Sequence, residues 1–238
     1  MKSSHLLRKC IPVFVLSLAA WAQPPAKAGS GAELERVLNR MDETAASFRT
    51  TQANFIWDQY QAVVEAKDTQ EGRVFFRRAG NQIEMAAEIA KVDGKPQPKY
   101  VLFSDNKVQM YQPGSVDTVD VYDAGKNKEA FESFLVLGFG GSGHGMLKSF
   151  EVTYAGQETL HGVSTDKLDL VPKSEKGRNM FNHILLWIDP RGFSVQQQLF
   201  NAEGDYRLAK YFDIQPNQKI SDSAFKLKTT GKTKIVSH

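Results

Sequence analysis

The chain has 238 residues, of which 41% are hydrophobic and 24% charged, with a formal net charge of +3. This length permits one large hydrophobic core without disulfides, and we expect a single domain over residues 32–238. The acidic and basic residues are nearly balanced, which argues against nucleic-acid binding, because that function needs a clustered basic surface.

The N-terminus is typical of a secretory signal peptide. A basic stretch precedes an apolar run at 11–20, and an Ala-x-Ala cleavage site ends at Ala22. The apolar run is too short to span a bilayer. We therefore expect a cleaved signal peptide over residues 1–22, export of the protein, and a flexible mature N-terminus over residues 23–31.

The predicted signal peptide holds the only cysteine, Cys10, and the whole charge excess. It contains three of the thirty basic residues and none of the acidic ones, so twenty-seven of each remain. The mature chain is therefore formally neutral and has no thiol for a disulfide, for catalysis or for metal binding.

The first predicted element of the mature chain is an amphipathic helix. Ser30 and Glu33 fit a capping box at its start. The apolar residues that follow at helical spacing are Leu34, Val37, Leu38, Met41, Ala45 and Phe48. The hydrophobic period then changes to two, which predicts strands at 53–64, 72–90 (a hairpin), 100–104, 107–111 and 116–122.

The hairpin between Gly72 and Met85 is the most informative segment. A two-residue loop at Ala79 and Gly80 would pair Arg78 with Asn81, Phe76 with Ile83 and Val74 with Met85. Alternation then places Arg78 on the apolar face and the unremarkable Arg77 on the other. A charge on an apolar face costs several kcal/mol unless it is paired or reaches water. Arg78 therefore snorkels off the sheet edge, pairs with a core carboxylate, or has a functional role.

A second helix is predicted over 126–137, inside the series of strands. The glycine-rich segment Gly138–Gly145 follows it. A helix precedes this segment and no Gly-Lys-Ser/Thr is present, so we interpret it as a hinge or helix connection rather than a phosphate-binding loop. Strands resume at 150–160, 163–170, 182–189, 193–200 and 205–214, and a helical turn near 221–225 precedes a last extended stretch.

This order of elements predicts a mainly β (α+β) fold. About ten strands in one antiparallel sheet would curl strongly, and helices would cover the concave face. We expect an incomplete β-barrel with the helices as a lid, and a closed barrel is the structural alternative. Residues 92–99, which include two prolines, read as a long loop.

Several motifs in this order resemble the LolA-like family, the periplasmic carriers of outer-membrane lipoproteins. The glycine-then-aromatic strand that ends in a basic pair is Glu71–Arg78. The motifs that follow it are Leu102–Lys107 with Met110-Tyr111, Leu168–Lys173, Ile188–Gly192 and Ser223–Leu227. Together they extend over nearly the whole mature chain.

The resemblance implies a half-barrel with lid helices over an apolar cavity. It implies a carrier that takes acylated lipoproteins from an inner-membrane ABC transporter complex and delivers them to an outer-membrane receptor. Such a carrier is a periplasmic protein without a cofactor, and we expect a monomer. The family's functional arginine matches Arg78, which would link the barrel to the lid in the closed state.

A carrier must hide acyl chains and still release them, which favours adaptable aromatic and methionine contacts over tight packing. The candidates for lining the cavity are Val74, Phe76, Ile83, Met85, Val101, Phe103, Met110, Phe131, Phe134 and Leu135. Ordinary core packing is the alternative interpretation for each of them.

Other chemistries find little support in the sequence. The histidines show no close metal-ligand spacing, and no Gly-x-Ser-x-Gly elbow is present, so we expect neither a metal site nor an enzyme. Two further functions stay open: a carrier of another lipid or glycolipid, and a lipoprotein-sensing regulatory domain of the RseB type.

Overall fold

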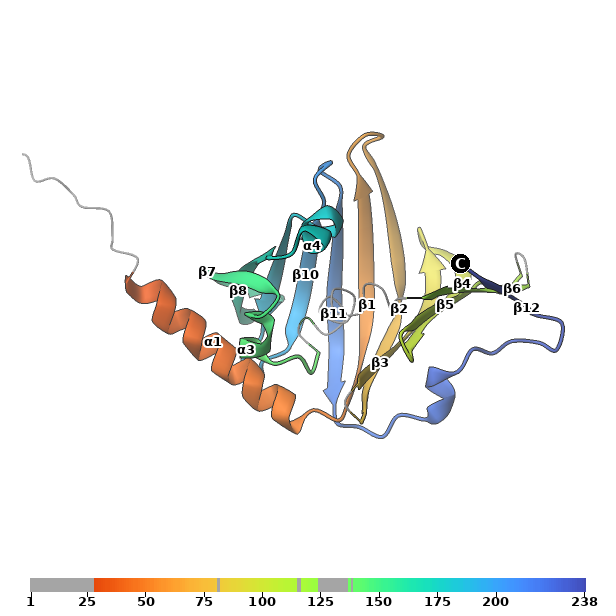
Figure 1. The fold of residues 1–238 in the computed structure, drawn as a ribbon, viewed down its shortest axis with the longest axis horizontal. Coiled ribbons are helices and arrows are strands. Elements are labelled where there is room, and N and C mark those ends of the chain that lie inside the picture. The colour runs from red at the N-terminus through yellow and green to blue at the C-terminus, as the bar shows by residue number, and fades with distance from the viewer. Residues whose placement is uncertain (1–27, 81, 115–116, 124–136, 138) are drawn as a thin grey trace, which may run out of the picture.

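The computed structural model describes residues 28–80, 82–114, 117–123, 137 and 139–238. Within them, twelve strands form one sheet in the order β12-β6-β5-β4-β3-β2-β1-β11-β10-β9-β8-β7 (Figure 1). The strands are β1 (Thr50–Gln61), β2 (Ala66–Ala79), β3 (Gln82–Val92), β4 (Lys95–Ser104), β5 (Lys107–Tyr111), β6 (Thr118–Asp123), β7 (Phe150–Leu160), β8 (Val163–Pro172), β9 (His183–Ile188), β10 (Ser194–Phe200), β11 (Tyr206–Pro216) and β12 (Lys234–Ser237). The helices are α1 (Ala28–Ser47), α3 (Gly143–Met146), α4 (Glu175–Met180) and the 3-10 turn η2 (Asp222–Phe225).

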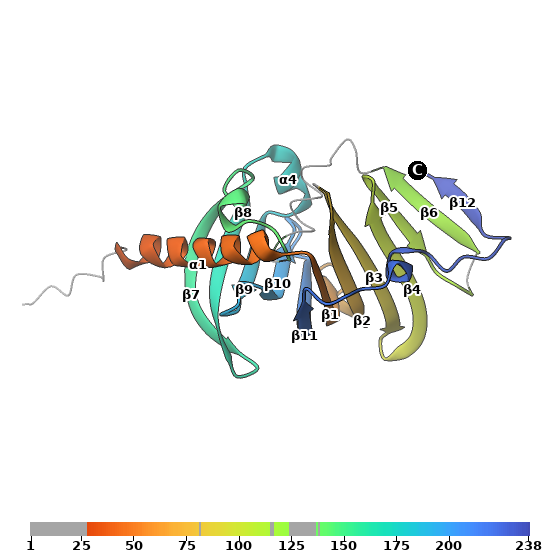
Figure 2. The same cartoon turned by 90° about the horizontal axis from the view of Figure 1, so that it is seen from below.

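The sheet is strongly curved but open. In the described strands, β7 and β12 stand at its two ends and each pairs with a single neighbour. Figure 2 shows the arc, with α1 lying along its β7–β10 half. The predicted incomplete barrel is therefore confirmed, and the closed-barrel alternative is wrong.

The hairpin of β2 and β3 has a different register from the predicted one. Ala79 pairs with Gln82, Arg78 with Ile83, and Phe76 with Met85. Every pair is thus displaced by two residues along β3. Because side chains alternate with a period of two, an even displacement leaves each residue on its predicted face. Arg78 therefore does share a face with Phe76.

The segment predicted as a long loop at 92–99 is mostly strand. β3 continues to Val92 and β4 begins at Lys95, so Asp93 and Gly94 form a tight turn, both at positive φ. Both prolines of β4 precede Tyr100, where the pairing of β4 with β5 begins. That end of β4 has one strand neighbour, so it tolerates prolines, which cannot donate a ladder hydrogen bond.

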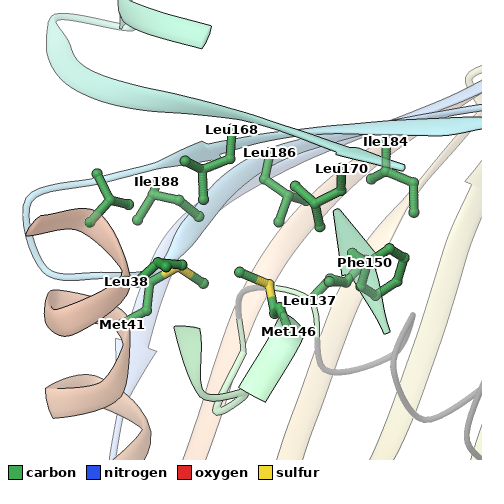
Figure 3. Packing of buried hydrophobic residues seen from close by; sticks show 11 residues of the cluster. Leu38, Met41, Leu137, Met146, Phe150, Leu168, Leu170, Ile184, Leu186 and Ile188 are labelled. Atoms are coloured by element: carbon green, nitrogen blue, oxygen red, sulfur yellow. The ribbon is translucent and has the colours of Figure 1, made fainter. Parts of the chain in front are cut away.

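Helix α1 begins at Ala28, two residues before the predicted start, and packs on the face of the sheet that we call the inner face. Its side chains Val37, Leu38 and Met41 are at most 1% exposed. They contact Leu137, α3 and alternate residues of β8 and β9 (Figure 3). The members of this first cluster on the sheet are Phe150, Leu168, Leu170, Ile184, Leu186 and Ile188.

A second apolar cluster continues along the inner face beyond α1. Cross-strand pairs carry the same face from Leu186 through Gln197 and Ala209 to Trp57. The buried members of this cluster are Phe48, Ala53, Phe55, Val74, Phe76, Ile89, Phe139, Phe193 and Ile214. The inner face is thus apolar from β9 to β4.

The outer face is covered in part by the chain between β11 and β12. Phe225 and its neighbours in this segment pack against Phe75, Ala86 and Leu102. The chain then ends in β12, which pairs parallel with β6, so one strand departs from the antiparallel pattern. In the described part of the chain, no helix is long and apolar enough to cross a membrane.

Candidate functional site

Arg78 stands at the end of β2, where the sheet meets the end of α1. Its backbone N–H donates to the Arg49 carbonyl oxygen at 2.8 Å. Its guanidinium donates to the carbonyl oxygens of Phe48 and Ala45, both at 3.4 Å, and of Gly140 at 3.3 Å. The guanidinium also lies 5.7 Å from the centre of the Phe48 ring.

These acceptors explain how a charge is kept on an apolar face. The last carbonyls of a helix have no partner within the helix, and the negative end of the helix dipole lies there. Ala45 belongs to the last turn of α1, and Gly140 belongs to the glycine-rich segment before α3. Arg78 therefore connects the sheet to two covering segments through backbone oxygens rather than through a carboxylate.

Phe139 fills the inner face directly beside this contact. It is 0% exposed and stacks on Phe76, with ring centroids 4.9 Å apart and an interplanar angle of 5°. Its ring also meets Tyr211 edge-on at 4.7 Å. Gly140 follows at φ +79°, and a Cβ there would lie 2.5 Å from the Phe48 ring. Glycine is therefore the residue that fits this backbone conformation and this close approach.

The predicted cavity residues lie in three environments. Val74, Phe76 and Phe103 are buried, while Ile83, Met85 and Val101 are partly buried against the second cluster. Met110 is 37% exposed on β5. Phe131, Phe134 and Leu135 lie outside the described residues. Val74, Phe76, Ile83, Met85 and Val101 thus belong to the apolar cluster that contains Phe139, whereas Phe103 and Met110 are not among its members. The role of all these residues in binding stays a prediction.

A buried ion cluster fastens the first half of α1 to β8. Asp166 is 4% exposed, and its carboxylate accepts hydrogen bonds from Arg36 at 2.8 Å and Arg40 at 2.7 Å. Tyr154 and Gln157 donate to the same carboxylate at 3.0 and 3.2 Å. Burial opposes ionisation of Asp166, but the hydrogen bonds from the two arginines outweigh it and lower its pKa to about 2.

The glycine-rich segment ends in α3, which is bound to α1 by polar contacts. Asp42 accepts from the Ser142 hydroxyl at 2.5 Å and from the His144 backbone N–H at 3.2 Å. The His144 ring bridges Asp42 and Glu35 at 2.5 and 2.9 Å, and these two hydrogen bonds raise the pKa of His144. These contacts fasten α3 to α1. The helix predicted over 126–137 lies outside the described residues except for Leu137, so the predicted role of the segment as a hinge or helix connection stays a prediction.

Arg77, on the opposite face from Arg78, has a role that the sequence reasoning missed. It pairs with Glu84 and, at 2.6 Å, with Asp222 of η2, and its guanidinium lies 4.1 Å from the centre of the Phe225 ring. It therefore fastens the segment that covers the outer face. Among the described residues, no group of His, Cys, Asp and Glu could hold a metal ion.

No family model and no curated protein matches the sequence. An uncharacterised conserved protein from Thermus thermophilus aligns with a TM-score of 0.54 at 10% identity, over 87% of this chain and 99% of that one. A LolA superfamily protein from Nitrosomonas europaea aligns at a TM-score of 0.40 and 13% identity, over 82% and 97%. MucB, in a MucA/MucB complex from Pseudomonas aeruginosa, aligns with a TM-score of 0.47 at 13% identity, over 82% of this chain and 61% of that one.

The Thermus protein shares this fold over nearly the whole of both chains. The open curved sheet and the helices on its inner face are the architecture that the sequence motifs implied. The chain therefore has the fold of the Thermus protein. At these identities the likeness concerns the fold alone.

The sequence contained one unused signal for the Asp166 cluster. Asp166 has the same parity in its strand as Leu168 and Leu170, so alternation places a carboxylate on the apolar face. Arg36 and Arg40 are four residues apart and share a helix face. Phe139 gave no comparable signal, because a lone aromatic residue among glycines has no period.

Proposed function

We propose that this protein is a periplasmic carrier that binds the acyl chains of lipoproteins on its inner face and carries them from the inner to the outer membrane. The observation that carries the proposal is that the Arg78 contact with Gly140 lies next to the Phe139 ring. Arg78 connects β2 both to α1 and to the Gly140 segment, and the Phe139 ring stacks on Phe76 of the apolar surface.

The apolar surface has the chemistry that acyl chains require. Each buried methylene contributes about 0.8 kcal/mol, so a lipid anchor with several chains gains tens of kcal/mol by leaving water. An acyl chain that displaces the Phe139 ring would take over its contacts with Phe76 and Tyr211. The exchange at this ring is between apolar groups, and the polar contacts that loading would break are those of Arg78 at the edge of the surface.

Arg78 would act as a latch that makes loading reversible. Its three carbonyl hydrogen bonds are 3.3 to 3.4 Å long, at the weak end of the range. Cargo that lifts the covering segments would break them, and part of its binding free energy would offset that loss. On release, the contacts form again and the closed state returns.

The latch is tested by two neighbouring substitutions on opposite faces of β2. Arg78→Leu should fold and bind an acylated lipoprotein but fail to deliver it to outer-membrane vesicles, since nothing restores the closed state. Arg77→Leu is the matched control, because it removes a paired arginine that contacts the outer-face segment instead. Normal delivery by Arg78→Leu, or equal defects in both variants, would refute the latch.

The cargo is tested separately by mass spectrometry of the ligand that co-purifies with the protein from the periplasm. A diacyl- or triacyl-peptide supports lipoprotein transport. A free glycolipid in its place would make the protein a carrier of another lipid on the same surface. The proposed loading and unloading partners, an inner-membrane ABC transporter complex and an outer-membrane receptor, rest on the family resemblance.

A further inference from the structure

A hollow of about 310 Å³ opens on the inner face at the end of the sheet away from Arg78. Arg78 lies beyond Thr50 at one end of β1, while the hollow is bordered by Gln59 near the other end. Nine residues of strand separate Thr50 from Gln59, which corresponds to roughly 30 Å. Phe139, Arg78 and the residues that Arg78 contacts do not border this hollow, so it lies apart from the proposed latch.

One wall of the hollow is apolar. Met180 and Phe181, at the end of α4, face Leu199 of β10 across it. Phe181 and Leu199 also pack against the first core cluster, so the wall is continuous with the apolar inner face. The volume lies at the lower end of the range for small-molecule sites. The remaining lining residues carry polar groups, and they are Gln59, Tyr60, Gln61, Asn201, Asp205, Tyr206 and Arg207.

The cationic residue that borders the hollow is Arg207. Its guanidinium lies 6.0 Å from the centre of the Trp57 ring and 5.8 Å from that of Phe181. Within the described part of the chain it makes no hydrogen bond or ion pair, so its donors are available to a ligand. Asp205 also borders the hollow, but its carboxylate accepts from the Ala62 N–H at 2.8 Å and from the Asn201 amide at 3.1 Å.

We infer that this hollow binds an anionic amphiphile, with the alkyl chain against Met180, Phe181 and Leu199 and the headgroup on Arg207. An arginine held between two aromatic rings presents its planar fork in a defined direction, which suits a carboxylate or a phosphate. The headgroup is a carboxylate if the ligand is a free fatty acid, and a phosphate if it is a phospholipid.

The test is calorimetric titration of the purified protein with decanoate, decyl phosphate and decyl maltoside, which share an alkyl chain and differ in headgroup. We expect at least one anionic probe to bind about tenfold tighter than decyl maltoside. The tighter of the two anions identifies the source of the headgroup. Equal affinity for all three probes would overturn the inference.

Three variants test whether the preference for anionic probes over decyl maltoside arises in the hollow. Arg207→Gln should abolish it, and Met180→Glu should reverse it by placing a like charge on the rim without touching Arg207. Arg73→Gln removes the same charge from the outer face and should keep it. If Arg207→Gln and Met180→Glu fold and still bind the anionic probes more tightly than decyl maltoside, the inference is wrong. That outcome would not affect the proposal of lipoprotein delivery, which Arg78→Leu tests.

Discussion

Phe139 lies flat on Phe76, with the two ring planes only 5° apart and the centroids 4.9 Å apart. Phe76 is one of the residues that the sequence predicted as cavity lining. Offset-stacked rings at this distance interact favourably beyond the burial of their area. The chain therefore supplies its own occupant for the apolar surface, and a lipid bound there as proposed would compete with that occupant.

The first prediction concerns the removal of this occupant. Phe139→Ala should lower the free energy of unfolding by about 3 to 5 kcal/mol, because it leaves a cavity in a fully buried site. A bound acylated peptide should restore more of the lost stability than it adds to the wild type, since it fills the same space. Urea unfolding with and without the peptide measures both effects.

Phe225→Ala is the matched control, because this ring packs on the outer face. It should destabilise the protein, and the bound peptide should raise its free energy of unfolding by no more than it raises that of the wild type. If the peptide rescues both variants equally, Phe139 does not occupy the binding surface.

The second prediction concerns the buried carboxylate under α1. Asp166→Asn leaves Arg40 without its counter-charge and leaves Arg36 only its exposed partner Glu33, so it should cost about 2 to 4 kcal/mol. Asp169→Asn is the control: its partner His183 lies 2.8 Å away at a site where both side chains are 34% exposed, so the expected cost is below about 1 kcal/mol. Similar unfolding midpoints for the two variants would contradict a stabilising role of the Asp166 cluster.

The third prediction is the acid sensitivity that the same carboxylate imposes. The pKa of Asp166 falls from 3.8 to about 2 on folding, so its contribution to stability is present above pH 3.8 and is lost as the pH falls through about 2. The shift corresponds to roughly 2 kcal/mol. Unfolding free energies between pH 6 and pH 2 should fall less steeply in Asp166→Asn. If the unfolding free energies of the wild type and the variant fall in parallel with pH, other carboxylates cause the loss of stability in acid.

Strand periodicity was the part of the sequence that predicted most. The register of the β2–β3 hairpin was wrong by two residues, yet Arg78 was assigned to the correct face, because alternation survives an even displacement. The contacts of Arg78 could not be derived in this way. Its acceptors, Ala45 and Gly140, are 33 and 62 residues away along the chain and are backbone carbonyls, which no residue type signals.

The segments that cover the sheet were the least predictable. Phe225 and β12 depend on long-range packing of a C-terminal stretch with little period of its own. Arg77 looked unremarkable because an arginine on a polar strand face is ordinary, and its pairing with Asp222 becomes visible only in three dimensions.

The fourth prediction tests why α3 begins with a glycine. A Cβ on Gly143 would lie 2.4 Å from the Leu38 carbonyl oxygen, which is backbone and cannot turn away. Gly143→Ala should therefore separate α3 from α1 and cost about 1 to 3 kcal/mol. In Gly145→Ala the new atom meets the Ser142 side chain at 3.1 Å, so a smaller change is expected. Equal unfolding midpoints for the two variants would show that this close approach is not limiting.

The last prediction concerns the pH dependence of the contact between α3 and α1. Hydrogen bonds to Asp42 and Glu35 raise the pKa of His144 above its ordinary 6.5. The stabilisation that the charged ring provides is therefore complete below pH 6.5 and is lost as the pH rises through the raised pKa. Amide exchange in α3 and in the last turns of α1 should accelerate over that range in the wild type, and it should already be fast at pH 6 in His144→Gln. His183→Gln removes a histidine from the outer face and should keep the wild-type dependence. If His144→Gln keeps it too, another group controls the contact.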